Sequence, residues 1–145
     1  MTIDSTAAVA PVVTRAGHES ADTADSGGAH RVSGVSIGHT PATKIWFGRV
    51  SNEPGFRSLP HHHGEAETGG YVLRGTARIY FGEDYTEWVD MAPGDFVFVP
   101  PFMPHVEANM SATDELVWLT ARTPDNIVVN LDDVPDSSLA GYRRA

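Results

Sequence analysis

Short apolar and alternating runs, separated by turn residues, constrain the fold of this chain more than any other feature. Seven runs have the length and the β-branched or aromatic content of strands, namely residues 44–50, 71–74, 77–81, 86–89, 96–99, 116–121 and 127–129. Proline, glycine and acidic residues that end strands or form turns lie between them. Residues 44–129 contain no stretch with sustained helical periodicity. Many short strands without βα alternation predict an all-β protein, built as an antiparallel sandwich or barrel.

The remaining segments divide the chain into an arm, one folded domain and a tail. A chain of 145 residues is long enough to bury a core and is expected to form a single domain. Residues 1–32 are rich in Ala, Thr, Ser, Asp and Gly and lack apolar periodicity, so we expect a flexible or loosely draped N-terminal arm. The folded domain then covers residues 33–131, and residues 132–145 form a polar C-terminal tail with a short helix at most.

Composition argues against several kinds of partner and chemistry. The chain has 10 Lys and Arg against 19 Asp and Glu, a net charge of -9, whereas nucleic acid and anionic membranes require clustered cations. No apolar run approaches the roughly 20 residues of a membrane span. The amino terminus does not resemble a secretory signal, so the cytoplasm is the expected location. Because the chain has no cysteine, any metal must be held by nitrogen and oxygen ligands.

Three consecutive histidines supply the first candidate for a functional site. Alternate side chains of a strand point to the same face, so His61 and His63 are expected to project together while His62 points away. Such a pair alone is also typical of an exposed polar strand end. The apolar run 96–99 favours a ligand pair over an exposed strand end. It ends at a proline pair, and His105 follows on the next predicted strand. Three imidazoles brought together from separate strands would make an open site for a first-row transition metal.

The spacing of these residues resembles the two sequence motifs of the cupin family. The first motif, G-x5-H-x-H-x3,4-E-x6-G, is matched by Gly55, His61, His63, Glu67 and Gly75. The second, G-x5-P-x-G-x2-H-x3-N, is matched by Gly94, Pro100, His105 and Asn109. The resemblance implies a double-stranded β-helix, the cupin jelly-roll barrel, whose matching histidines hold one divalent transition metal per subunit. Fe(II) is the expected metal, and Mn, Ni, Zn and Cu are alternatives.

Two positions depart from these motifs. Glu67 has the required spacing from His63, but counting back from Gly75 puts Thr68 in the carboxylate position. Only one of them points inward on a regular strand, although a bulge at the following glycine pair would reset the alternation. We expect Glu67 as the fourth ligand, with a three-histidine site as the alternative. In the second motif Phe102 replaces the internal glycine, which predicts a different turn because a side chain penalises positive φ.

The resemblance and the expected ligands together predict a metal-dependent enzyme. Three imidazoles and a carboxylate leave coordination positions for a substrate or dioxygen. The resemblance implies a dioxygenase that oxidises or cleaves a small dicarbonyl, phenolic or similar chelating substrate. The alternatives are a redox-neutral isomerase or decarboxylase and a noncatalytic cupin that binds a small molecule. The sequence assigns no catalytic residue beyond the ligands, and the resemblance also implies a homodimer.

Overall fold

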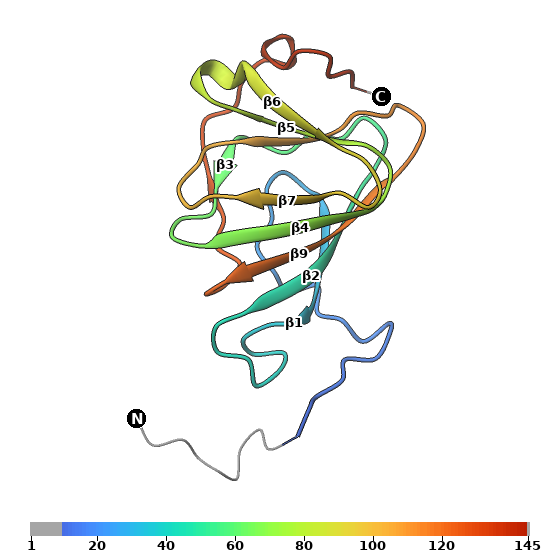
Figure 1. Cartoon of the computed structure of the whole chain (residues 1–145), viewed down its shortest axis with the longest axis vertical. Helices are drawn as coiled ribbons and strands as arrows, with labels where there is room; N and C mark the ends of the chain where they lie inside the picture. Colours follow the sequence, from blue (N-terminus) through green and yellow to red (C-terminus); the bar gives the residue numbers. More distant parts are fainter. Residues whose placement is uncertain (1–9, 145) are drawn as a thin grey trace.

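A five-stranded antiparallel sheet forms one layer of the molecule. The computed structural model describes residues 10–144, and Figure 1 shows most strands of this sheet lying one above another. The order is β1-β2-β9-β4-β7, with bounds His30–Val35, Trp46–Asn52, Leu116–Thr123, Glu67–Arg74 and Phe96–Val99 respectively. Their β-branched and aromatic side chains pack well on a pleated, half-buried surface, which explains why these segments form strands.

A shorter sheet and a two-strand ribbon complete the fold. The second sheet has the order β6-β5-β8, with bounds Glu87–Met91, Ala77–Phe81 and Val106–Asn109, and β10 (Val129–Asn130) pairs with β3 (His61–His62). The helices of residues 10–144 are two 3-10 segments, η1 (Glu83–Tyr85) and η2 (Asp136–Ser138). Within that range no helix has the length and apolar character needed to cross a membrane. The predicted all-β antiparallel architecture is confirmed.

Alternate residues of both sheets point into one apolar core. The buried members of this core are Ala29, Val50, Val72, Ala77, Ile79, Met91, Val99, Leu116 and Trp118. Full burial of a large apolar side chain stabilises a fold by about 1.5–3 kcal/mol, so this cluster supplies much of the driving force for folding. The Trp118 indole N–H donates a hydrogen bond to Asn52 Oδ1 at 3.2 Å, which satisfies its one polar group.

The N-terminal segment contacts the folded domain over much of its described length. β1 begins at His30 and pairs with β2, so residues 30–32 of the predicted arm belong to the sheet. Upstream, the buried Ser26 hydroxyl donates to Asn130 Oδ1 at 2.8 Å. The Ala24 carbonyl accepts hydrogen bonds from Arg31 (3.0 Å) and Asn126 (2.9 Å). These contacts are polar and were therefore invisible to a search for apolar periodicity, and the part of the predicted arm at residues 1–9 lies outside the described residues.

The C-terminal tail packs on the outer face of the three-stranded sheet. A second buried cluster joins the tail to β5 and β8 and comprises Tyr80, Val106, Ala108, Leu139 and Tyr142. The Arg57 guanidinium adds ion pairs with Asp133 (2.7 Å) and Asp136 (3.0 Å). Figure 1 shows the tail lying along the end of the molecule that carries β5 and β6. The strands β5 and β8 are therefore covered on both faces, whereas β6 is mostly exposed.

Candidate metal centre

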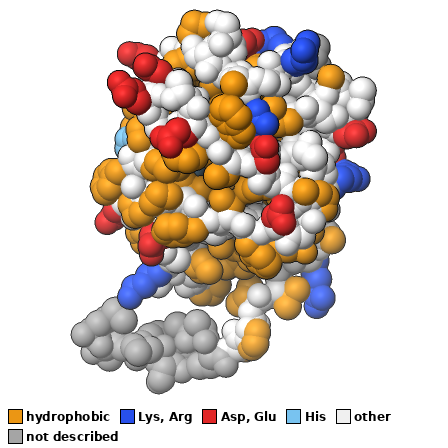
Figure 2. Space-filling view, turned by 45° about the horizontal axis from the view of Figure 1, so that its top comes forward, with side chains coloured by type: hydrophobic (Ala, Val, Ile, Leu, Met, Phe, Trp, Pro, Cys, Tyr) orange, Lys and Arg blue, Asp and Glu red, His pale blue; other side chains and the backbone are white. Residues whose placement is uncertain are grey.

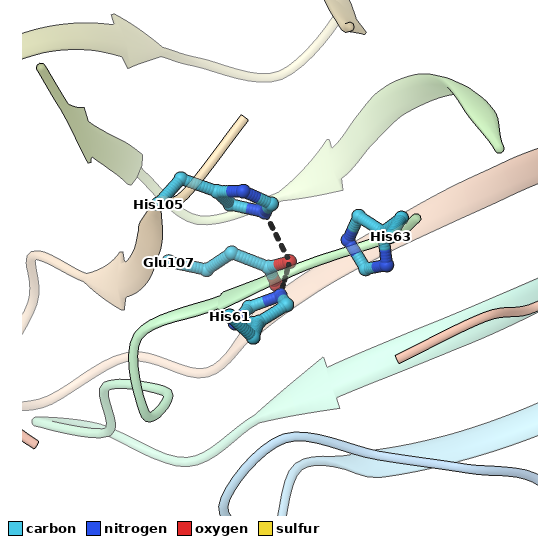
Figure 3. A group of neighbouring side chains, drawn as sticks. All are labelled: His61, His63, His105 and Glu107. Carbon is cyan, nitrogen blue, oxygen red and sulfur yellow. Dashed lines mark ion pairs between the residues drawn. The ribbon is translucent and has the colours of Figure 1, made fainter. Parts of the chain in front are cut away.

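Two short strands bring three histidines and one glutamate to a single point inside the molecule. His61 on β3 forms an antiparallel bridge with His105, and their backbone N–H groups donate reciprocally at 3.0 and 2.9 Å. His63 follows His61 by two residues, and Glu107 on β8 follows His105 by two residues, so alternation puts each pair on one face. Figure 3 shows the three imidazole rings and the carboxylate gathered around one point.

The separations among these side chains suit a single metal ion. One ligand atom from each of the four residues lies within 4.8 Å of the others. His61 Nε2 is 3.3 Å and His105 Nε2 is 3.6 Å from Glu107 Oε1. Two donors that are each about 2.1 Å from one metal lie about 3.0–3.4 Å apart at tetrahedral or octahedral angles. The cluster is enclosed by protein, since the three histidines are at most 1 % exposed and Glu107 is 5 % exposed.

Backbone carbonyl groups fix the orientation of all three rings. Each histidine places Nδ1 against a carbonyl oxygen, which belongs to Leu59 for His61 (2.8 Å), to Ile127 for His63 (2.7 Å) and to Met103 for His105 (2.9 Å). A carbonyl accepts and never donates, so Nδ1 must carry the proton of each neutral ring. Each Nε2 is then unprotonated and can act as an acceptor or as a metal ligand. This arrangement is typical of metal-ligating histidines, whose second nitrogen donates to a neighbouring oxygen.

The electrostatics of the cluster favour the forms that bind metals. Burial lowers the pKa of His61, and burial together with the nearby Arg122 charge lowers the pKa of His63 to about 2. Burial opposes ionisation of Glu107, but contacts with His105 and His61 still hold its pKa well below the usual range. His61 and His63 are therefore neutral and the Glu107 carboxylate is ionised, the forms that metal binding requires.

Two unpartnered nitrogen atoms indicate which kind of group would bind at the centre of the cluster. His61 Nε2 and His105 Nε2 are buried without a hydrogen-bond partner. Both nitrogens face the same Glu107 oxygen. A cation between them would satisfy both nitrogens and the carboxylate together, and three nitrogens with one oxygen suit a divalent first-row transition metal. The residues present therefore fit such an ion.

Glu67, the carboxylate expected from the sequence, is not brought into the cluster. β4 pairs with β9 in regular register from Glu67 to Val72, which leaves Glu67 exposed and Thr68 buried. The register shift lies between Val72 and Arg74, beyond the glycine pair at which a bulge was considered. The alternation is therefore not reset, and Glu67 faces away from the three histidines that the structure does bring together.

The carboxylate near the histidines is instead Glu107, which the motif comparison missed. Its signal in the sequence is His105-x-Glu107, the same two-residue spacing that links His61 to His63. Two other polar residues of this region lie outside the cluster, and one of them, His62, was expected to point away. His62 is half-buried outside the cluster, and its Nδ1 accepts from the Gly64 N–H at 2.9 Å. The Asn109 amide donates to three backbone carbonyls, a structural role, at 2.8 to 3.2 Å.

Phe102 adopts the positive φ that a glycine tolerates more readily. Its φ is +59°, in the left-handed region that a side chain disfavours. The side chain therefore does not exclude positive φ at this turn, which was the reason for expecting a different turn. The Phe102 N–H donates to the Gly64 carbonyl at 2.8 Å, a bond that ties this turn to the residue after His63. That bond offsets part of the cost of the left-handed conformation.

A buried arginine lies beside the histidine cluster. Arg122 on β9 is 3 % exposed, and its Nη2 donates to His63 Nε2 at 3.1 Å. Thr68 Oγ1 accepts from Arg122 Nε at 2.9 Å, and Asn126 Oδ1 accepts from Nη1 at 2.7 Å. Burial, with the charge of Arg31, lowers the pKa of Arg122 to about 9, so the guanidinium remains charged at neutral pH. Arg122 lies outside both sequence motifs, which is why it was missed.

The fold and the cluster define a class of protein: a small antiparallel β-barrel with a buried histidine and glutamate site. A family model described as the cupin domain matches residues 48–122. The chain belongs to the cupin superfamily, and its double-stranded β-helix is confirmed. No curated protein sequence matches the chain.

Solved structures of other cupins are similar to this chain. A deletion mutant of Bacillus subtilis oxalate decarboxylase is 26% identical with a TM-score of 0.62, and the match covers 75% of this chain and 30% of that enzyme. The chain thus spans about a third of the length of oxalate decarboxylase. Another structure of that enzyme concerns its Mn(II) centres. A Klebsiella pneumoniae protein with a double-stranded β-helix domain, 16% identical, has a TM-score of 0.61 and covers 77% of this chain and 91% of its own. The latter likeness supports the fold alone.

Proposed function

We propose that this protein is a metal-dependent enzyme, a dioxygenase that oxidises a small chelating substrate. The observation that carries the proposal is the convergence of three unprotonated Nε2 atoms and one ionised carboxylate within 4.8 Å in the barrel interior. Buried side chains at such separations without a structural partner are typical of a functional site. Fe(II) is the metal that we expect, held by His61, His63, His105 and Glu107 in place of Glu67.

The residues of the chain would hold the ligand atoms in position and exclude water from the site. The backbone carbonyls behind the three rings hold each Nε2 toward the common point, and Glu107 contributes the one negative charge. A bound metal with open positions would supply Lewis acidity and, for a redox-active ion, reaction with dioxygen. The burial of the cluster keeps bulk water from these groups, which strengthens every electrostatic interaction there.

Reconstitution with defined metals tests the proposal. We expect purified protein to take up about one divalent metal per chain, measured by elemental analysis. Metal-free protein is then loaded separately with Fe(II), Mn(II), Ni(II) or Zn(II), and oxygen uptake is recorded with diketones, phenolic ketones and flavonols. Oxygen consumption that requires both Fe(II) and substrate is the expected result. Protein that remains metal-free after reconstitution would contradict the proposal.

A redox-neutral decarboxylase is the second candidate, favoured by the 26% identity with oxalate decarboxylase over three quarters of this chain. The same loaded samples distinguish the two reactions when carbon dioxide release from small dicarboxylates is measured beside oxygen uptake. Release of carbon dioxide without net oxygen consumption would replace the dioxygenase with this candidate. Ligand binding without turnover of any substrate would indicate a noncatalytic binding protein.

A further inference from the structure

The barrel interior holds more positive than negative charge. Among the buried residues of the described chain, the arginine, lysine, aspartate and glutamate side chains are Arg31, Glu107 and Arg122. Arg31 and Arg122 are 5 % and 3 % exposed, so water does not compensate their charges. A divalent metal at the histidines would add two positive charges, and Glu107 would balance only one of the total. Buried charge without a counterion is costly, so the loaded site requires further negative charge.

The two arginines belong to one hydrogen-bonded network beside the histidines. Arg31 Nη1 donates to the Ala24 carbonyl at 3.0 Å, and Asn126 Nδ2 donates to the same carbonyl at 2.9 Å. Asn126 Oδ1 in turn accepts from Arg122 Nη1 at 2.7 Å. Both guanidinium groups are thus anchored on one side through the same loop residues. Arg31 Nε remains buried without a partner, an unmet donor in this part of the barrel.

The contact between Arg122 and His63 conflicts with metal binding at the same nitrogen. Arg122 Nη2 donates to the His63 Nε2 lone pair at 3.1 Å. One lone pair cannot serve a metal and an N–H donor together, so metal uptake would release this N–H group. The Nε and Nη1 atoms would stay fixed by Thr68 and Asn126. A charged donor would then remain next to the metal, held in place and without an acceptor.

We infer that Arg122, with Arg31 behind it, binds the negatively charged group of a carboxylate substrate next to the metal. This inference rests on the proposed function and adds the charge class of the substrate to it. A guanidinium donates in a planar fork that matches a carboxylate, and such charge-assisted bonds are short and strong. A small dicarboxylate or enolate would both chelate the metal and balance the excess positive charge. Arg122 would thus select anionic over neutral chelators.

Binding of a charged and a neutral probe of the same shape tests this inference. Oxalate is a dianion, and oxamide is its neutral diamide. The protein is loaded with Zn(II), which is not redox-active and cannot support oxidation of the probe, and the affinity for each probe is measured by isothermal titration calorimetry. We expect Arg122→Gln to weaken oxalate binding by about 10- to 100-fold, the loss of one hydrogen bond to a charged group, and to leave oxamide binding unchanged. Zinc content should stay at the wild-type value.

Two further variants keep the test decisive. Arg74→Gln removes an exposed arginine on β4 that pairs with Glu115, and it should change neither affinity. Arg122→Lys keeps the buried charge and should fold even if Arg122→Gln does not, while it loses the planar fork and weakens oxalate binding about threefold or more. Full zinc content with unchanged oxalate affinity in the Arg122 variants would overturn the inference alone. Failure of the wild type to bind zinc would instead overturn the proposed function.

Discussion

The two halves of the barrel interior differ in chemistry although the same strands build both. On β9 the inward residues change from Leu116 and Trp118 to Thr120 and Arg122 along one face. The first two pack in the apolar core, and Arg122 lies beside His63. Strand alternation explains why all four point inward, but it does not explain why the second pair is polar.

The difference indicates which half stabilises the fold and which half functions. Burying leucine and tryptophan removes apolar surface from water and stabilises the protein. Burying an arginine, a glutamate and three histidines costs free energy unless each polar group is satisfied. The free energy gained by burial in the apolar half therefore offsets the cost of burying polar groups in the other half. Substitutions in the apolar half should lower stability, whereas substitutions in the polar half should mainly change binding.

The largest expected effect on stability comes from Trp118→Ala in the apolar half. We expect a loss of about 3–5 kcal/mol in the free energy of unfolding, because a large cavity replaces the indole. Chemical denaturation measures this loss, and zinc stoichiometry of the folded fraction should remain that of the wild type. The neighbouring Leu119→Ala, on the outer face, should cost about 1 kcal/mol. Equal losses for the two variants would show that the apolar half is not the main source of stability.

In the polar half, His105→Ala should abolish high-affinity metal binding. We expect the affinity for Zn(II) to fall by more than about 100-fold, because changes to groups that only support a ligand already cost 10–100-fold. Zinc at 100 times its Kd should stabilise the wild type by about 2.7 kcal/mol and leave the variant unchanged. Thermal unfolding with and without zinc measures both. His62→Ala is the matched control, since it removes an adjacent histidine outside the cluster and should keep the zinc response.

A smaller effect distinguishes the two candidate carboxylates. Glu107→Gln keeps the size of the side chain and removes its charge, so the affinity for Zn(II) should fall by about 10- to 100-fold. Glu67→Gln should leave the affinity unchanged because Glu67 is exposed on β4. Competition with a zinc-sensitive dye measures both affinities. The reverse ranking would restore the carboxylate that the sequence motif indicated and would require β4 to slip by one residue.

The fold was predictable from the sequence because its long strands are rich in β-branched and aromatic residues. The runs at residues 77–81 and 96–99 coincide with β5 and β7. The segments that form β1, β3 and β8 are not among the seven apolar runs, and β3 and β8 were anticipated only through the histidines expected on them. β3 is two residues long, β8 is four, and both adjoin polar metal-site residues, so their apolar signal is weak. β1 follows a polar segment and carries Arg31 and Ser33 on its inward face.

The candidate site was predictable in its histidines and not in its carboxylate. Spacing along a strand identifies His61 and His63 as a pair, and the second motif adds His105. The position of Glu67 depends on whether β4 contains a bulge, which is a property of strand pairing and not of local sequence. The role of Arg122 depends on the approach of β9 to the loop after β3, a contact between residues 59 positions apart.

The outer faces of the two sheets also differ, because within residues 10–144 the C-terminal tail packs on the three-stranded sheet and not on the five-stranded one. Leu139 and Tyr142 of the tail cover β5 and β8 of the three-stranded sheet. On the five-stranded sheet Phe96 is 81 % and Phe98 59 % exposed, next to a hollow lined partly by Phe47 and Tyr71. Figure 2 shows hydrophobic side chains gathered between acidic ones on one side of the molecule. Contiguous exposed apolar surface of this kind is typical of an interface.

We therefore predict a homodimer in which a second copy covers the outer face of the five-stranded sheet. Light scattering at micromolar concentration should give twice the monomer mass, because a self-complementary apolar face is satisfied by a two-fold partner. The double variant Phe96→Ser and Phe98→Ser should shift the protein to the monomer with zinc content unchanged. Phe102→Ser removes an exposed phenyl ring outside this face and should leave the mass unchanged. A wild-type monomer would show that this face is covered by something other than a second copy, while the metal site, which lies inside one chain, would be unaffected.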